Sequence, residues 1–338
     1  MKKMGKLLIH LIKGVKQPVS RLLEVKNLSV SFSYGREEIS VIDDINFEIE
    51  TGQTVALVGE SGSGKSVTSL SIMQLLSTPG DSDTRGEILF EGKNLLTQSE
   101  REMCRLRGKE ISMIFQEPMT SLNPVLTVGD QLVEIFRYHL RISKKEAEQK
   151  AKNMLEIVGI ARADEILHEY PHRLSGGMRQ RVMIAMAMCC QPKLLIADEP
   201  TTALDVTIQA QILDLLKDLN RTYNTSILLI THDLGIVSEV ADKVIVLYAG
   251  QIVEKTKVEQ LFEQPLHPYT KGLLASLPSL DKEVERLESI PGNVPLPDEM
   301  PQGCRFAPRC RQAVENCFFQ KPPVREAKPG HFVRCFLH

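Results

Sequence analysis

A glycine-rich loop between an expected strand and an expected helix has the residue types of a phosphate-binding site. In "TVALVGESGSGKSVTS" an apolar strand, 55–58, leads into the loop, and a helix is expected to begin at Lys65. Glycines let backbone N–H groups curl around phosphate oxygens, and the helix N-terminus adds partial positive charge. The spacing fits G-x-x-x-x-G-K-[ST], in which the lysine contacts the terminal phosphates and the next hydroxyl binds magnesium. The nucleotide-binding residues predicted here are Gly59, Ser61, Gly62, Ser63, Gly64, Lys65, Ser66 and Val67.

Two acids after a second apolar run supply the groups that hydrolysis requires. The run 194–197 leads directly into Asp198 and Glu199, as at the carboxyl end of a buried parallel strand. Asp198 would hold magnesium, directly or through water, and Glu199 would be the base that orients or deprotonates the attacking water. Together with the phosphate loop, this pair predicts nucleotide hydrolysis.

A third motif, "LSGGM" at 174–178, exposes a second helix N-terminus. Ser175, Gly176 and Gly177 leave backbone N–H groups free for an anion. With this motif the sequence resembles the ATP-binding subunits of ABC transporters, in which the LSGGQ-like signature of one subunit closes on the ATP held by the phosphate loop of another. Met178 stands where glutamine is more common. The resemblance implies ATP and Mg²⁺ as cofactors.

The same resemblance implies roles for residues elsewhere in the chain. Gln116 in "SMIFQEP" is similar to the Q-loop residue that contacts magnesium or the attacking water, and His232 in "ILLITHD" is similar to the switch histidine that contacts the γ-phosphate. Asp205 resembles the D-loop residue at the dimer interface. Tyr34 is the aromatic residue expected to stack on adenine, with Phe32 close by. The catalytic residues implied are Glu199, His232 and Gln116, and the magnesium ligands are Ser66, Gln116 and Asp198.

Strands alternate with helices from about residue 23 to 255, which predicts a parallel sheet covered on both faces. The segments "LLEVKNLSVSFSY" and "DDINFEIETGQ" alternate apolar and polar residues and predict an antiparallel layer. A helix capped by Ser143 and ended by Gly159 lies between Gln116 and the signature, where the resemblance implies a helical subdomain. A hairpin is expected to turn at Ala249 and Gly250.

The expected fold class is therefore α/β. It consists of a P-loop ABC ATPase core, with a RecA-like parallel sheet plus an antiparallel β layer, a helical subdomain, and a small irregular C-terminal cysteine-rich domain. The predicted domains are a basic N-terminal extension at 1–22, the ABC ATPase domain at 23–255 with its helical subdomain at about 118–190, and a C-terminal domain at 256–338.

Three stretches narrow the family. "FQEPMTSLNP" at 115–124, "HPYTKGLLASLP" at 267–278 and the tail "GCRFAPRC" resemble the ATPase subunits of oligopeptide and dipeptide permeases, a group that includes nickel importers. In this group the partners are two transmembrane permease subunits, a second related ATPase and an extracytoplasmic substrate-binding protein. The ATPases usually form a heterodimer, and a homodimer stays open.

Four of the seven cysteines lie in the proline-rich C-terminal segment. A small appendage without a large apolar core needs a metal, disulfides or a partner, and a reducing compartment argues against disulfides. The spacing C-x5-C-x6-C-x17-C would let thiolates converge on a metal, although spacing alone does not choose iron–sulfur over zinc. The resemblance implies a structural 4Fe–4S cluster, with zinc and free thiols as alternatives, on Cys304, Cys310, Cys317 and Cys335.

Composition and charge argue against two other functions, nucleic-acid binding and membrane spanning. A net charge of −2 gives no bulk electrostatic reason to expect nucleic acid as a partner. No apolar run approaches the roughly 20 residues that a membrane span requires. Residues 1–21 carry six basic residues and no acid, a pattern that fits a weak amphipathic helix on a membrane surface or a frayed tail. The expected location is peripheral, on the cytoplasmic face of the cell membrane.

The function predicted is an ATP-hydrolysing subunit that powers import of oligopeptides or dipeptides through an ABC permease complex. A nickel or nickel-chelate importer of the same group is one alternative. A soluble ABC ATPase without a membrane partner is another, but DNA-repair and chromosome-maintenance relatives split the two halves of the site with a long coiled coil. Translation-factor relatives carry two cassettes in one chain, whereas this chain has one copy of each motif.

Overall fold

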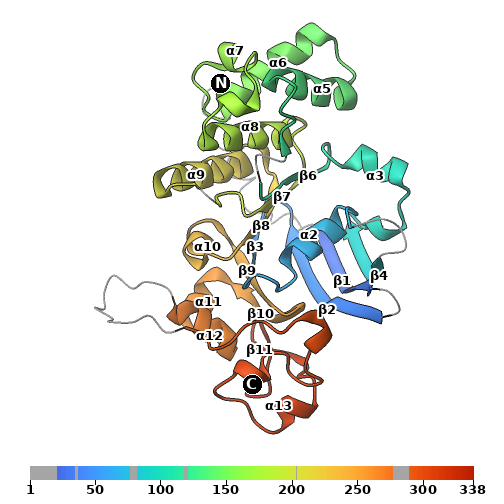
Figure 1. Ribbon diagram of the computed structural model, residues 1–338, viewed down its shortest axis with the longest axis vertical. Helices are drawn as coiled ribbons and strands as arrows, with labels where there is room; N and C mark the ends of the chain where they lie inside the picture. Colours follow the sequence, from blue (N-terminus) through green and yellow to red (C-terminus); the bar gives the residue numbers. More distant parts are fainter. Residues whose placement is uncertain (1–20, 35–36, 77–81, 118–120, 203, 277–288) are drawn as a thin grey trace, which may run out of the picture.

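The computed structural model describes residues 21–34, 37–76, 82–117, 121–202, 204–276 and 289–338. Within these ranges an eight-stranded mixed sheet runs through the centre of the molecule in the order β11-β12-β10-β9-β3-β8-β7-β6 (Figure 1). Its strands are β3 (Thr54–Val58), β6 (Ile111–Ile114), β7 (Leu194–Asp198), β8 (Ser226–Thr231), β9 (Lys243–Tyr248), β10 (Gln251–Lys257), β11 (Val324–Lys328) and β12 (His331–Arg334).

The predicted parallel arrangement holds for the part of this sheet that carries the sequence motifs. β3 pairs in parallel with β8 and β9, and β7 pairs in parallel with β6 and β8. The carboxyl ends of β6, β7 and β8 therefore lie side by side at one edge, which is where ligand-binding residues gather in such sheets.

A four-stranded antiparallel sheet covers one face of the central sheet, in agreement with the predicted antiparallel layer. β1 pairs antiparallel with both β2 and β4, and β4 pairs with β5. Its buried residues form one apolar cluster with residues of the central sheet such as Val55 and Ile196. The strands are β1 (Arg21–Tyr34), β2 (Glu37–Glu50), β4 (Ser82–Phe90) and β5 (Lys93–Asn94).

Alternation along the strand explains why β7 contributes side chains to two different apolar clusters. In β7, Leu194 and Ile196 pack toward the antiparallel sheet, whereas Leu195 and Ala197 pack into the cluster formed with the helices. Successive side chains of a strand point to opposite faces, so a strand buried on both faces is apolar throughout. All five residues of β7 are buried.

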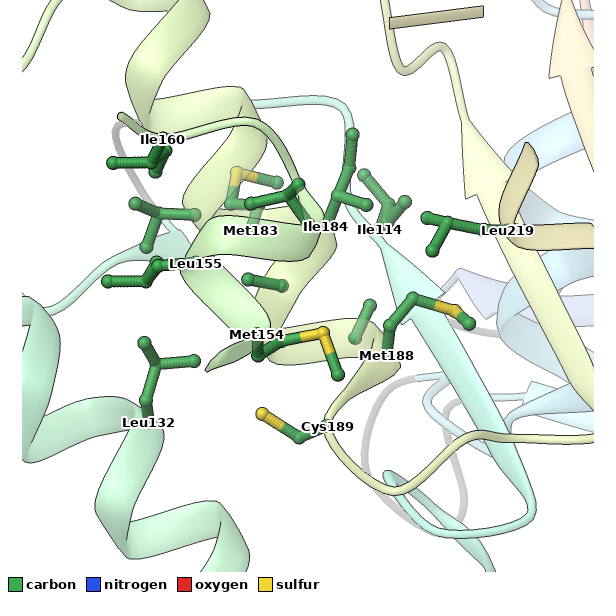
Figure 2. Packing of buried hydrophobic residues seen from close by; sticks show 14 of the residues in the cluster. Ile114, Leu132, Met154, Leu155, Ile160, Met183, Ile184, Met188, Cys189 and Leu219 are labelled. Atoms are coloured by element: carbon green, nitrogen blue, oxygen red, sulfur yellow. The ribbon is translucent and has the colours of Figure 1, made fainter. Parts of the chain in front are cut away.

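Helices α5 to α8 lie together at one end of the molecule (Figure 1), between the Gln116 segment and β7. The predicted helix is confirmed as α6, with Ser143 at its N-cap accepting a hydrogen bond from Glu146 N–H. Figure 2 shows Leu132, Met154 and Ile184, from three different helices, in one buried cluster. The helices of the molecule up to β9 are α2 (Lys65–Ile72), α3 (Glu100–Leu106), α5 (Val128–Leu140), α6 (Lys144–Ile157), α7 (Ala163–Ile166), α8 (Gly176–Met188), α9 (Val206–Tyr223) and α10 (Leu234–Val240).

The hairpin between β9 and β10 turns at Ala249 and Gly250, as predicted, and both have positive φ, 46° and 78°. A Cβ at position 250 would lie 1.9 Å from the carbonyl oxygen of Val41. Glycine is therefore required here both by the backbone conformation and by the close approach of β2.

The C-terminal residues join the central sheet. β12 pairs antiparallel with β10, so this segment extends the central sheet. Phe306 packs against the rings of Tyr248 and Tyr269 in a cluster shared with β3 and β9. The remaining helices are α11 (Val258–Glu263), α12 (Pro268–Ala275) and α13 (Asn316–Phe319), and the short 3-10 helices are η2 (Leu95–Thr97), η3 (Pro171–Arg173), η4 (Pro297–Glu299) and η5 (Ala307–Arg309).

The structure also bears on the membrane prediction. In the described part of the chain, no helix combines the length and apolar content needed to cross a membrane. Residues 1–20 of the predicted basic extension lie outside the described ranges, and β1 begins at Arg21.

Candidate functional site

The predicted phosphate loop connects β3 to α2, and α2 begins at Lys65 as expected. Gly64 caps this helix with φ of 103°, and a Cβ there would lie 2.5 Å from Ile42 Cδ1. The position therefore requires glycine. Ser61, Gly62 and Ser66 are exposed, so the loop is open to solvent on the side where a phosphate would bind.

Other predicted loop residues are buried beneath this surface. The Ser63 side-chain oxygen is buried without a hydrogen-bond partner, although the Ser63 carbonyl accepts a bond from Gly250 N–H at 2.8 Å. Val67 is partly buried against the cluster shared with the antiparallel sheet. The turn between β9 and β10 is thus hydrogen-bonded to the buried side of the phosphate loop.

Lys65 points back onto the loop. Its Nζ donates to the carbonyl oxygens of Gly59 at 2.8 Å and Glu60 at 3.0 Å. Burial lowers the pKa of Lys65, and the nearby carboxylates of Glu199, Asp198 and Glu60 oppose this shift. An incoming phosphate would replace the carbonyl oxygens as the acceptor of the ammonium group.

Asp198 ends β7 with its carboxylate buried and its Oδ1 atom unpaired. Burial raises the pKa of Asp198, a hydrogen bond from Ser66 opposes the shift, and the charge of Glu199 adds to it. An unpaired carboxylate oxygen beside a hydroxyl fits a hard cation such as Mg²⁺, which takes oxygen ligands from one or two side chains and from phosphates. Asp198 and Ser66 are therefore suited to the predicted ion.

Glu199 lies in a left-handed backbone conformation with φ of 47°. This conformation is unfavourable for glutamate and is found where surrounding contacts enforce it, often at functional sites. The Glu199 N–H donates to the Ile230 carbonyl at 2.9 Å. The bend directs the carboxylate out of the strand toward the ends of the neighbouring strands.

Three side chains hold the Glu199 carboxylate. Gln116 Nε2 donates to Oε2 at 2.9 Å, Thr202 Oγ1 donates to the same atom at 3.0 Å, and His232 Nδ1 lies 3.3 Å from Oε1. Burial raises the pKa of Glu199, but the contacts with Thr202, His232 and Lys65 outweigh it and leave the pKa below its ordinary value. Glu199 is thereby held as a carboxylate.

The sheet explains why these residues meet. Gln116 follows β6, Glu199 follows β7 and His232 follows β8, and these three strands are neighbours in one parallel sheet. Thr202 was not predicted from the sequence, because a threonine three residues after a glutamate carries no signal until the turn that joins them is known.

The signature residues lie elsewhere. Ser175 caps α8 and accepts a hydrogen bond from Met178 N–H at 3.3 Å, while Gly176 and Gly177 form the first turn. A Cβ on Gly177 would lie 2.9 Å from Ile208 of α9, so the glycine permits close helix packing. In Figure 1 the helix α8 lies well away from α2. Within one chain, the signature and the phosphate loop therefore do not form a single site.

Two predicted nucleotide-binding residues remain to be placed. Asp205 caps α9, and its Oδ1 accepts a hydrogen bond from Ile208 N–H at 3.0 Å. Tyr34 is the last residue of β1, but its side chain lies outside what the structure describes. Its contact with adenine therefore stays a prediction.

The expectation of a 4Fe–4S cluster, or of zinc in its place, is wrong. Among the described residues, no group of three or more His, Cys, Asp or Glu side chains is arranged to hold a metal ion. All four thiols are free, and they line one cavity of about 10 Å³, which is room for no more than about one water molecule. The residues concerned are Cys304, Cys310, Cys317 and Cys335.

The physical reason for this correction is the apolar surroundings of the thiols. Burial raises the pKa of Cys304 to about 11, and it also raises the pKa values of Cys310 and Cys335. A metal binds the thiolate, whereas burial among apolar groups favours the neutral thiol. Phe306 and Pro322 line the same cavity, so the cysteines pack there as small apolar side chains.

Two protein-family models match the chain. Residues 42–202 match the family described as "ABC transporter", and residues 253–317 match "Oligopeptide/dipeptide transporter, C-terminal region". The first match contains the phosphate loop, Gln116, the signature and Glu199. The second contains three of the four C-terminal cysteines.

Curated relatives match over almost the full length. The oligopeptide transport ATP-binding protein AppD of Bacillus subtilis is 59% identical over 320 residues, which cover 95% of this chain and 98% of that protein. The oligopeptide transport ATP-binding protein OppD of Salmonella typhimurium is 50% identical over 320 residues, which cover 95% of this chain and 95% of that protein.

Solved structures agree on the fold. The ATP-binding cassette MJ0796, in a dimeric post-hydrolysis state bound to ADP and Pi, superposes with a TM-score of 0.63 at 28% identity, covering 70% of this chain and 98% of that chain. The cassette CbiO1 from Clostridium perfringens superposes with a TM-score of 0.61 at 27% identity, covering 72% of this chain and 91% of that chain. The chain therefore belongs to the ABC transporter family, among the oligopeptide transport ATP-binding proteins.

Proposed function

We propose that this chain hydrolyses ATP through Glu199 and that hydrolysis powers the import of oligopeptides or dipeptides. The observation that carries the proposal is the set of contacts around Glu199, in which Gln116 and His232 from the two adjacent strands converge on its carboxylate. A carboxylate held in its ionised form can orient and deprotonate a water molecule.

The remaining site residues divide between binding and charge neutralisation. The phosphate loop, from Gly59 to Val67, binds the β- and γ-phosphates of ATP through backbone N–H groups and Lys65. Ser66, Asp198 and Gln116 would hold Mg²⁺, which would supply positive charge beside the phosphates. The unpaired Oδ1 of Asp198 and the exposed hydroxyl of Ser66 support this assignment.

His232 contacts the γ-phosphate and also fixes the orientation of Glu199. Because its Nδ1 lies beside the carboxylate, its Nε2 is left to face the nucleotide. Tyr34 stacks on adenine. Both roles follow from the position of these residues in the family motifs and from the strand ends at which they lie.

We infer that two ATPase subunits meet head to tail to complete each site. The phosphate loop is open to solvent, and in Figure 1 helix α8, which begins at the signature, lies apart from helix α2, which follows the loop. Ser175, Gly176 and Gly177 of one subunit would then close on the ATP held by the other, with Asp205 at the interface. The second subunit is a related ATPase or another copy of this chain.

The assembly that this chain powers includes two transmembrane permease subunits and an extracytoplasmic substrate-binding protein. The chain itself is a peripheral subunit on the cytoplasmic face of the membrane. Its relatives are named as oligopeptide transport proteins, and this favours peptide over the nickel importer and over a soluble ATPase without a membrane partner. The domain division proposed is 1–22, 23–255 with a helical subdomain at about 118–190, and 256–338.

Replacement of the proposed base tests the function. In the assembled transporter, Glu199→Gln should lower peptide-stimulated ATP turnover at least about a hundredfold, the lower limit of what a general base contributes. Binding of MgATP should change less than about twofold, since the phosphate contacts remain. Where the partner ATPase has its own active site, that site is silenced in every sample.

The matched control is Glu87→Gln on β4, an exposed glutamate of the antiparallel sheet. It should leave both turnover and binding unchanged. Turnover by Glu199→Gln at the wild-type rate would exclude Glu199 as the base. Stimulation of the wild-type complex by nickel chelates, and not by peptides, would replace the proposed substrate.

A further inference from the structure

Glu60, in the phosphate loop, has all of its polar groups engaged. Its carboxylate is held by both terminal nitrogens of Arg309, at 2.6 Å and 3.1 Å. Its N–H donates to the hydroxyl oxygen of Tyr269 at 2.9 Å, and its carbonyl oxygen accepts a bond from Lys65 Nζ at 3.0 Å. One residue of the loop is thus fixed from three directions.

Two of these contacts come from the C-terminal segment, more than 200 positions away in the sequence. The paired geometry of guanidinium and carboxylate is the strongest form of ion pair, because two parallel hydrogen bonds fix both distance and orientation. The contact therefore ties the C-terminal segment directly to the loop that binds phosphate.

Arg309 and Tyr269 are themselves rigidly placed. The side chain of Arg309 is 5% exposed, and its Nε donates to the Pro291 carbonyl at 2.7 Å. Tyr269 is fully buried on α12, with its ring 4.6 Å from that of Tyr248 and 5.4 Å from that of Phe306, measured between centroids. Neither side chain can follow a movement of the loop without disturbing this packing.

The charge of Glu60 gives the contact a consequence for ATP. A carboxylate within a phosphate-binding loop repels the triphosphate, and the Glu60 side chain retains 31% of its exposure. Arg309 neutralises that charge and holds the carboxylate on the side of the loop that faces the C-terminal segment. Without Arg309, the free carboxylate would oppose an anionic ligand and offer Lys65 an alternative partner.

We propose that Arg309 is a positioning residue of the nucleotide site: with Tyr269, it neutralises and holds Glu60, so that the C-terminal segment sets the affinity of the phosphate loop for MgATP. This inference rests on the proposed function, because it requires that the loop binds ATP. Arg309 acts through Glu60 and does not itself touch the nucleotide.

The test measures the dissociation constant of MgATP for the full-length chain at fixed ionic strength. Arg309→Met should weaken binding about tenfold, which corresponds to ~1.4 kcal/mol. Adding Glu60→Gln to Arg309→Met removes the unpaired negative charge and should restore most of the lost affinity. A purely structural role for Arg309 gives no such recovery, because the second substitution cannot rebuild the packing.

The matched control is Arg334→Met. Arg334 is a buried arginine of the same segment that pairs with Asp44 on β2 and does not contact the loop. It should leave the MgATP affinity within about twofold of wild type. If Arg309→Met does not fold, Arg309→Gln, which can still donate a hydrogen bond to Glu60 but carries no charge, takes its place and should weaken binding severalfold, again with recovery on adding Glu60→Gln.

The outcomes separate the two proposals. A wild-type chain that does not bind MgATP would overturn the proposed function and this inference with it. A wild-type chain that binds, together with Arg309 variants that bind equally well, would overturn the inference alone. Weakened binding without recovery by Glu60→Gln would also overturn it, since Arg309 would then act only on the stability of the fold.

Discussion

Acid should destabilise this protein through one buried histidine. His267 is 1% exposed and caps α12, where its Nδ1 accepts a hydrogen bond from Tyr269 N–H at 3.1 Å. Burial, together with the nearby charges of His338 and Lys271, lowers the pKa of His267 from 6.5 to about 3. The folded protein therefore keeps this imidazole neutral at pH values at which the unfolded chain protonates it.

The sign and size of the effect follow from proton linkage. Below pH 6.5 the unfolded state binds a proton that the folded state does not, so stability falls as pH falls toward the folded-state value of about 3. Each pH unit in this window corresponds to about 1.4 kcal/mol. Between pH 7 and pH 5 the contribution of His267 to the free energy of unfolding should decrease by about 2 kcal/mol.

The assay compares wild type with His267→Asn. Asparagine is a good N-cap and can accept the bond from Tyr269 N–H, but it does not titrate. Urea unfolding at pH 7 and pH 5 gives the loss of stability for each protein. Wild type should lose about 2 kcal/mol more than the variant, because the other titrating groups are the same in both proteins and the cavity left by the smaller side chain does not depend on pH.

NMR spectra of histidine-labelled protein provide a direct check. The His267 ring should stay neutral down to pH 5. An equal loss of stability in both proteins, or a His267 resonance that titrates with a midpoint near pH 6.5, would refute the reasoning.

Two further predictions concern the turn between β9 and β10 and the proposed catalytic base, Glu199. Gly250→Ala should lower the free energy of unfolding by about 2 kcal/mol or more, since a Cβ there would lie 1.9 Å from the Val41 carbonyl oxygen. Gly92→Ala is the control, because Gly92 has the same φ of 78° but open space around a Cβ; an equal loss in both would assign the effect to the backbone alone. Thr202→Val should raise the pKa of Glu199, because a hydrogen bond that lowers it is lost. The acid limb of the pH profile of kcat/KM for ATP hydrolysis should then move to higher pH, and an unchanged limb would contradict the role of Thr202.

The sequence by itself determined the local parts of the nucleotide site. The loop from Gly59 to Lys65 and the helix cap at Ser175 depend on backbone conformations that a few adjacent residues specify. Apolar runs that end in Asp198 or His232 also indicated strand ends. The roles of Gln116 and His232 came from the family resemblance, and the parallel strand order explains why they meet at Glu199, because parallel strands bring their carboxyl ends to one edge.

Only the tertiary structure decided the contacts between distant segments. The bonds from Arg309 and Tyr269 to Glu60 join parts of the chain more than 200 positions apart, and no local pattern encodes them. The pairing of β12 with β10, which joins the C-terminal segment to the central sheet, is likewise a contact that no local pattern encodes.

The four C-terminal cysteines show most clearly what the spacing of residues in a sequence cannot predict. Their intervals allowed a metal site, a redox site or free thiols, and the choice depended on charge and burial, which spacing does not contain. The structure places Cys304 in apolar surroundings that favour the neutral thiol. Residue types and intervals thus determined which side chains could do chemistry. The surroundings that distant segments supply decided their ionisation: Glu199 is held as a carboxylate, whereas the partly buried Cys304 is kept as a neutral thiol.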